Sequence, residues 1–173
     1  VDKVFGSTAL MYAAIAEHTS VVEVLLGDER VDRNIVSEEY GNTALIFAAS
    51  NGHDSVVKAL LGDERVDRNI VDKKYGNHAL MYAAGYGHTS VVKLLVEDKK
   101  TNLNLANKIG TTALMFSVDK GHVEVVSELL RDKRINVNVM MPTMNFTPLM
   151  FAAQKGHDSI VNLLFFVKKN KCG

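Results

Sequence analysis

The chain of 173 residues contains one cysteine, two prolines and no tryptophan. Because Cys172 has no second cysteine to pair with, an intrachain disulfide and a zinc site built from cysteines are both excluded. The fold must therefore be held together by packing and hydrogen bonding. A single cysteine is compatible with a reducing cytosol and equally with an exported protein that avoids cysteine.

The chain also lacks a charge excess and a long apolar run. Lys plus Arg number 20 and Asp plus Glu number 20, so no overall charge indicates a nucleic acid or an anionic membrane as partner. No apolar run approaches the roughly 20 residues of a membrane span, and no signal-peptide pattern opens the chain. We expect a cytoplasmic protein. Because the chain starts at Val1, an exported or periplasmic location is the alternative if an N-terminal signal was removed.

The neutral total conceals an uneven distribution of charge along the chain. Residues 1–70 carry 12 acidic and 6 basic side chains, a net charge of −6, whereas residues 71–173 carry 8 and 14, a net charge of +6. If the molecule is elongated, we expect it to be acidic at one end and basic at the other.

What the chain does contain is a repeat. One heptad recurs at steps of 35, 35, 34 and 35 residues, as TALMYAA, TALIFAA, HALMYAA, TALMFSV and TPLMFAA. A histidine and an apolar stretch of the type Val-Val-x-x-Leu-Leu follow each heptad in the same register. Five copies leave no room for a separate domain, so we expect one domain with repeats at approximately 1–40, 41–75, 76–109, 110–144 and 145–173.

Each landmark of the repeat has a local structural role. The threonines that begin four heptads are suited to cap a helix, and Pro148 falls at a first helical position, where its missing N–H is tolerated. The glycine before four of the histidines suits a left-handed helix end. The Val-Val-x-x-Leu-Leu stretch predicts a second helix with one buried face. Turn-rich segments containing Gly41, Gly76 and Gly110 predict hairpin-like links.

These landmarks together resemble the ankyrin repeat, and the resemblance covers essentially the whole chain. It implies an all-α solenoid of five helix-turn-helix units of about 35 residues, joined by hairpin-like fingers and stacked side by side. The motif histidine of the family is replaced in every unit by a methionine or isoleucine, which we expect to fill the space by packing. His78 replaces the capping threonine of the third unit, which should cost about 1 kcal/mol unless the imidazole bonds to the same amides.

The resemblance also implies a function, because ankyrin-repeat proteins bind partner proteins through a concave face made of fingertips and first helices. We therefore expect a non-catalytic module without cofactor or metal, acting as an inhibitor or self-protection partner of an enzyme, or as an adaptor. Residues that differ between units are the candidate contacts. Carried over by position, the expected partner-binding residues are Glu38, Glu39, Tyr40, Asn51, Lys73, Lys74, Tyr75, Tyr86, Lys108, Ile109, Asp119, Lys120, Met141, Met144 and Lys155.

Several of these side chains also have a structural interpretation. Tyr40 and Tyr75 are equally suited to pack against their own hairpins. The stripe of Tyr12, Phe47, Tyr82, Phe116 and Phe151 favours packing between repeats over a ligand platform. The apolar loop containing Met140, Met141, Met144 and Phe146 indicates either an interface or a local apolar cluster.

Other functions are less well supported by the sequence. The five periodic histidines suggest a metal site, but packed helices lie about 8–10 Å apart, too far for neighbouring rings to share one ion. Nucleic-acid binding lacks interleaved aromatic residues among its candidate contacts, Lys99, Lys100, Lys108, Arg131, Lys133 and Arg134. The main alternative is a structural repeat segment of a larger multidomain protein, because the ends lack polar capping units and Leu163–Val167 is apolar.

Overall fold

The computed structural model describes residues 8–143 and 145–171, which contain ten α-helices and no β-strand. The helices alternate between a first and a second helix of each unit. Their bounds are α1 Ala9–Ile15, α2 Thr19–Gly27, α3 Ala44–Asn51, α4 Asp54–Gly62, α5 Ala79–Tyr86, α6 Thr89–Glu97, α7 Ala113–Asp119, α8 Val123–Arg131, α9 Pro148–Lys155 and α10 Asp158–Lys171. No helix in these ranges is both long and apolar enough to cross a membrane.

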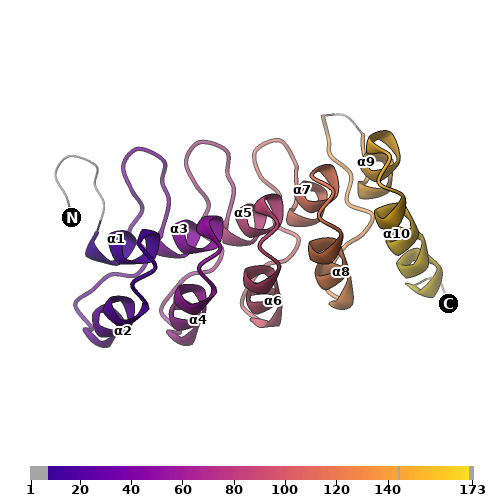
Figure 1. Cartoon of the computed structure of the whole chain (residues 1–173). Coiled ribbons are helices and arrows are strands. Elements are labelled where there is room, and N and C mark those ends of the chain that lie inside the picture. Colours follow the sequence, from indigo (N-terminus) through magenta and orange to yellow (C-terminus); the bar gives the residue numbers. More distant parts are fainter. Residues whose placement is uncertain (1–7, 144, 172–173) are drawn as a thin grey trace.

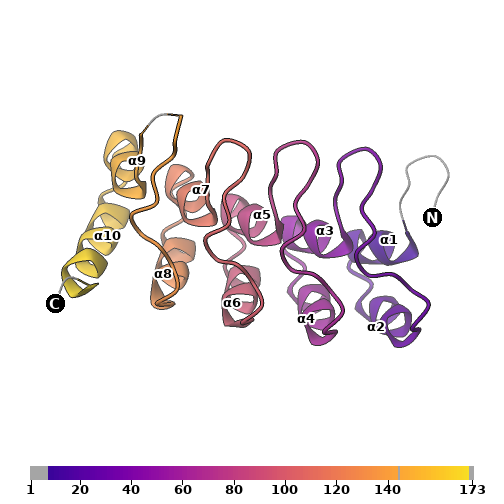
Figure 2. The same cartoon turned by 180° about the vertical axis from the view of Figure 1, so that it is seen from behind.

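The helices form five antiparallel pairs that stack into an elongated array (Figure 1). The first helices, α1, α3, α5, α7 and α9, form one row and pack against their neighbours along it. The second helices form another row, which lies below the first in Figure 1, and the loops of the links extend beyond the first helices on the opposite side. Figure 2 shows from behind that the two ends of the chain lie at opposite ends of the array. The predicted all-α solenoid is confirmed.

The predicted caps are present in four first helices. The hydroxyl groups of Thr8, Thr43, Thr112 and Thr147 accept hydrogen bonds from the third amide of their helix, and Pro148 occupies the first turn of α9. The glycines at the predicted helix ends have positive φ, for example +77° at Gly52. Caps and stops are decided by short-range sequence, which explains why they were predictable.

His78 occupies the N-cap position before α5, but its side chain does not cap the helix. Its side chain accepts no bond from the helix amides, and Nε2 instead lies 3.2 Å from the carbonyl oxygen of Asn102 in the next link. The ring is fully buried, and this burial lowers the histidine pKa to about 4. The third unit therefore has an uncapped first helix and a neutral imidazole in its core.

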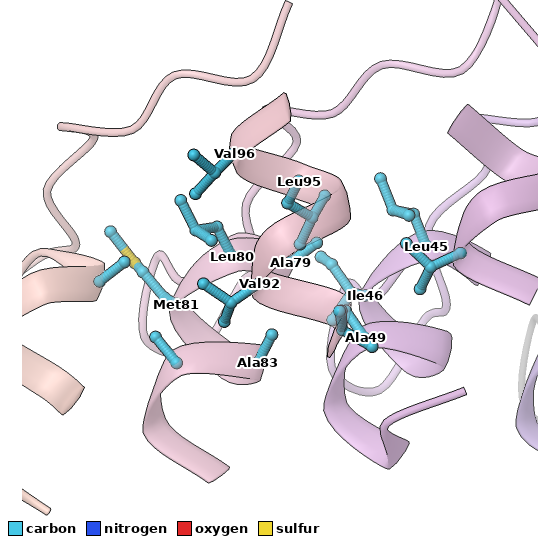
Figure 3. Packing of buried hydrophobic residues seen from close by; sticks show 14 of the residues in the cluster. Leu45, Ile46, Ala49, Ala79, Leu80, Met81, Ala83, Val92, Leu95 and Val96 are labelled. Carbon is cyan, nitrogen blue, oxygen red and sulfur yellow. The ribbon is translucent and has the colours of Figure 1, made fainter. Parts of the chain in front are cut away.

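The core is a continuous apolar layer between the two rows. Figure 3 shows the arrangement around the second and third units, where alanines such as Ala83 allow close approach of neighbouring pairs and leucines such as Leu95 fill the space behind. The side chains at the motif-histidine position, Met11, Ile46, Met81 and Met115, are about 1 % exposed. The expected packing role is confirmed for these four. It is wrong for Met150, which is half exposed because no described helix covers it.

The links are joined to one another by a row of asparagines at equivalent positions. Asn34 Nδ2 donates to the carbonyl of Arg65 (2.8 Å), and its Oδ1 accepts from the amide of Asp67 (2.8 Å). Asn69 and Asn104 repeat both bonds with the next links. Each asparagine thus satisfies one donor and one acceptor of the following unit, which fixes the spacing of the stack.

Two buried arginines connect the first three units. Arg33 Nε lies 3.0 Å from Asp63 Oδ2, and Arg68 makes the same contact with Asp98. Each guanidinium also donates to backbone carbonyls of its own unit, including Leu26 for Arg33. At the equivalent positions of the later units the structure has buried apolar side chains, Leu103 and Val137. At this one repeated position, contacts between units are therefore made by ion pairs in the first three units and by apolar side chains in the later ones.

Candidate functional site

The fingers are closed by a side chain at one repeated position. In the second finger, residues 72–77, the Asp72 carboxylate accepts hydrogen bonds from the amides of Tyr75 (2.6 Å) and Asn77 (2.9 Å). Ser37 and Asn107 close their own fingers through equivalent side-chain bonds. The last finger has an apolar residue there, and its closure rests on the backbone bond from Met141 N to Phe146 O (2.9 Å). These bonds hold the fingertips in defined positions.

Neighbouring fingers are also bonded to each other. The amide of Lys73 donates to the carbonyl of Tyr40 (2.9 Å), and the amide of Lys108 donates to the carbonyl of Tyr75 (3.0 Å). The Lys108 ammonium group donates to the carbonyls of Lys73 and Lys74. The fingers and the row of first helices together form a continuous surface, which we call the concave face.

The concave face contains an aromatic pocket between the third and fourth units. We define this pocket by Tyr75, Tyr82, Tyr86, Ile109 and Phe116, and its volume is about 340 Å³. Tyr75, Tyr86 and Ile109 are all more than half exposed. The rings of Tyr82 and Tyr86 stack with centroids 6.2 Å apart and an interplanar angle of 20°. The pocket therefore presents preformed apolar surface to solvent.

A hydrogen bond fixes the floor of the aromatic pocket. The Tyr82 hydroxyl donates to Asp72 Oδ2 (3.0 Å), the same oxygen that closes the second finger. Burial, together with the charge of Asp72, raises the pKa of Tyr82 to about 12. The tyrosine is thus a neutral donor that connects α5 to the finger above it.

A second hollow of about 340 Å³ adjoins the aromatic pocket, because Ile109 and Phe116 line both. It extends along α7 past Asp119 to Met141 and Phe151. The Phe151 ring makes an edge contact with Phe146 at 5.2 Å. Together the two hollows form a largely apolar groove across the last three units, which we call the concave groove.

Charged side chains surround the concave groove. The Lys74 ammonium lies 4.9 Å from the centre of the Tyr75 ring, and Lys120 lines the aromatic pocket. Asp119 is partly neutralised by Lys155, at 3.1 Å, and by Lys120, at 3.7 Å. The surroundings of the groove are therefore mainly basic.

The first finger is acidic instead. It carries Glu38 and Glu39 at its exposed tip, and a hydrogen bond to Glu39 raises the pKa of the Tyr40 hydroxyl. The concave face therefore changes from acidic to basic along the stack, following the charge gradient of the sequence.

The predicted partner-binding residues fall into three groups. Tyr75, Tyr86, Ile109, Asp119, Lys120 and Met141 line the concave groove. Glu38, Glu39, Tyr40, Asn51, Lys73, Lys74, Lys108 and Lys155 lie outside its lining. Met144 lies outside the described residues. Met141 is buried and contributes little accessible surface, whereas Met140 beside it is 53 % exposed.

Some lining residues were not among the predicted contacts. Tyr82 and Phe116 were assigned to packing between units, and they do pack against the core. Both also leave part of the ring at the surface of the groove. In the sequence, one feature points to this role in the groove: both residues belong to the periodic aromatic stripe and lie a few positions before the variable Tyr86 and Asp119.

The periodic histidines contact backbone instead of one another. Nε2 of His53, His88 and His122 lies 3.0–3.1 Å from a carbonyl oxygen of the preceding unit. Within the described residues, no group of three or more His, Cys, Asp or Glu side chains is placed to hold a metal ion. The rings of His53, His88 and His122 therefore connect neighbouring units, whereas His157 Nε2 is buried without a hydrogen-bond partner among the described residues.

The basic side chains considered for nucleic-acid binding are mostly paired. Acidic partners lie within 4 Å of four of them. The pairs are Lys99 with Asp132, Lys100 with Glu64, Arg131 with Glu128, and Arg134 with Asp132. Pairing reduces the positive potential available to a polyanion.

Comparison with known proteins gives one family. A family model of ankyrin repeats matches the chain three times, over residues 1–72, 64–141 and 80–172, which together cover almost its whole length. No curated protein matches the chain in sequence.

Proposed function

The chain belongs to the ankyrin-repeat family, whose members generally act as protein–protein interaction modules, and on that basis we propose that it binds a partner protein through its concave groove. The observation that supports the proposal is a preformed groove that leaves Tyr75, Tyr86 and Ile109 more than half exposed. Exposed rigid aromatic side chains around a central pocket are typical of residues that dominate binding energy.

The shape of the groove favours a protein segment over a small ligand. Each hollow is at the lower end of the 300–1,000 Å³ range of small-molecule sites, and the described residues leave both open to solvent. Two adjoining hollows instead match two large apolar side chains of one partner segment. Asn77 and Asn107, which also line the aromatic pocket, add polar groups near its base.

The charges indicate what the partner presents. Lys74 and Lys120 flank the aromatic pocket, so a segment with acidic side chains beside its apolar anchors is the best complement. Glu38 and Glu39 at the first finger disfavour an acidic surface at that end. The gradient along the concave face thus favours one direction of the bound segment over the other.

The role that follows is non-catalytic. A module of this kind acts by covering a surface of its partner, as an inhibitor or self-protection partner that occludes an enzyme's cleft, or as an adaptor. Two carboxylates beside or in the groove already have structural bonds: Asp72 bonds to Tyr82 and to two finger amides, and Asp119 pairs with Lys155. This arrangement supports binding without chemistry at the groove.

A capture experiment with two matched double variants tests the proposal. The groove variant, Tyr86→Ala with Ile109→Ala, removes exposed apolar groups without touching the buried core. The control variant, Val24→Ala with Lys93→Ala, changes exposed side chains of α2 and α6 in the second-helix row. Immobilised chains are incubated with native extract, and bound proteins are quantified by mass spectrometry.

We expect a protein that the wild type and the control variant retain equally and that the groove variant loses by at least about tenfold, the effect of removing two central anchors. Equal retention by both variants would place binding elsewhere. Retention of no protein by the wild type would favour the alternative, a structural segment of a larger protein.

A further inference from the structure

Every unit of the stack presents two packing surfaces. We call the surface that faces the next unit the forward face and the surface that faces the preceding unit the backward face. The internal faces are buried against each other, so they show which residue types and what degree of burial are typical of each position in a packed face. The forward face of the fifth unit and the backward face of the first unit have no described neighbour.

The forward face of the fifth unit has the same chemistry as the buried ones. Met150 is 51 % exposed, whereas the equivalent Met11, Ile46, Met81 and Met115 are each about 1 % exposed. Ala153 is exposed where the equivalent positions of the other units, such as Ala49 and Val118, are completely buried. Phe165, on α10, is 56 % exposed at the position of the buried Val96. The surface is therefore an uncovered stacking face.

The forward face also contains an empty receiving position. In the internal units a glycine receives the imidazole of a later histidine, so that a Cβ atom on Gly52 would lie 2.7 Å from His88. Gly87 receives His122, and Gly121 receives His157, in the same way. No atom of a described residue lies within 4 Å of the equivalent position on Gly156. The space beside Gly156 is therefore equivalent to the spaces that receive a histidine ring in the internal units, but no described histidine occupies it.

The backward face of the first unit carries the complementary groups. Val21 is 45 % exposed, whereas Val56, Val91, Val125 and Ile160 at the same position are at most 1 % exposed. His18 is exposed, and its ring makes no hydrogen bond or ion pair with a described residue. In the second, third and fourth units this histidine contacts a carbonyl of the unit before it. The first unit therefore offers a free valine and a free histidine.

We propose that a second copy of this chain stacks head to tail on the first, with its backward face on the forward face of the fifth unit. Val21 of one copy then packs against Met150 of the other, and His18 enters the space beside Gly156. By the register of the internal contacts, His18 reaches the carbonyl of Gln154, as His53 reaches that of Ile15.

The charge of the molecule favours this arrangement over a symmetric one. Residues 1–70 have a net charge of −6, residues 71–173 have +6, and the two ends of the array lie far apart. Head-to-tail contact brings unlike ends together, whereas either symmetric contact brings like ends together. A heterologous contact leaves one open face at each end, so the assembly grows beyond a dimer.

Two single variants and their mixture test the proposal on the full chain. Val21→Asp blocks the backward face, and Met150→Asp blocks the forward face. Both positions are about half exposed, so the variants should fold, which circular dichroism verifies. Ser90→Asp, in the first turn of α6, adds the same charge to the middle of the array as a control. Weight-average mass is measured by sedimentation equilibrium over a concentration series.

We expect the mass of the wild type and of Ser90→Asp to rise with concentration past that of a dimer. Each blocked variant alone should stay monomeric, because one of the two required faces is missing. An equimolar mixture of the two should form a dimer and stop there, since each variant keeps the face that the other has lost.

Other outcomes would overturn the proposal. A wild type that remains monomeric at every concentration would mean that these faces receive further repeats or a different protein. Association of Val21→Asp alone, or of Met150→Asp alone, would indicate a symmetric contact through the unblocked face. A mixture that remains monomeric would also exclude head-to-tail stacking.

Discussion

Replacing His78 by threonine should make the chain less sensitive to mild acid. The imidazole is buried in the third unit, and desolvation lowers its pKa from an ordinary 6.5 to about 4. When the pKa of a histidine is lower in the folded chain than in the unfolded chain, acid favours unfolding, because at intermediate pH only the unfolded chain binds a proton at this ring. The stability of the wild type attributable to the neutral ring is thus fully present above about pH 6.5 and is lost as the pH falls toward about 4.

The size of the effect follows from the two pKa values. With 6.5 in the unfolded chain and about 4 in the folded one, His78 alone removes about 2 kcal/mol between about pH 7 and about pH 5. Threonine does not titrate in this range, and Thr43 and Thr112 cap their helices at the same position. A new cap contributes about 1 kcal/mol, which offsets part of the packing lost with the ring.

Urea denaturation followed by far-UV circular dichroism, repeated across this pH range, measures the effect. His18→Thr is the control, because His18 is exposed and its ring has no described partner within the monomer, and all three chains are measured at a concentration at which the wild type is monomeric. Between about pH 7 and about pH 5, the free energy of unfolding should fall in all three chains. We expect the fall to be about 2 kcal/mol smaller in His78→Thr than in the wild type or the control. Equal pH dependence in all three chains would refute the assignment of a buried neutral imidazole.

Three further predictions concern the contacts between units, each measured by urea denaturation at neutral pH. Asp63→Ala should destabilise the fold by about 3 kcal/mol, because it leaves the buried Arg33 without its carboxylate. Arg33→Leu should cost less, since Asp63 keeps its bond to Arg65 and leucine occupies the equivalent position 103; the reverse order would contradict the ion-pair argument. Asn69→Ala removes two bonds to the next link and should cost about 1–2 kcal/mol, and an unchanged midpoint would show that they contribute nothing. Gly110→Ala, at φ +84° and with its Cβ pressed against the Pro142 ring, should cost more than about 1 kcal/mol, whereas Gly62→Ala, in open space at a helix end, should be neutral or stabilising.

The features that the sequence predicted well are decided locally. The four threonine caps and the glycine stops act within one helical turn, so the residue types and their spacing were sufficient. The periodic apolar pairs predicted the second helices for the same reason. His78 was recognised as a departure, but its actual partner lies 24 residues away at Asn102.

The contacts between units were not predicted. Arg33 and Asp63 are 30 residues apart in the chain and meet only because the links stack in register. Asn34, Asn69 and Asn104 recur at a step of 35 residues, a signal that a common role exists. Which atoms they bond depends on the path of the neighbouring link, and no local rule supplies that path.

The candidate site was predicted in part. Tyr75, Tyr86 and Ile109 were expected on the concave face, and they line the aromatic pocket. Tyr82 and Phe116 were assigned to packing, because a periodic aromatic stripe has the pattern of a core. Their second role, as lining of the groove, arises because the fingers cover these rings only in part. The sequence pattern does not show how the fingers lie over the helices.

Hydrogen–deuterium exchange of the chain alone and with its captured partner tests the central claim, that the concave groove binds a protein. We expect slower exchange at the second and third fingers, residues 72–77 and 107–111, and along α5 and α7. Exchange in α4 and α6 should be unchanged, because they lie in the opposite row. Slowing confined to the second-helix row, or absent from these two fingers, would contradict the account.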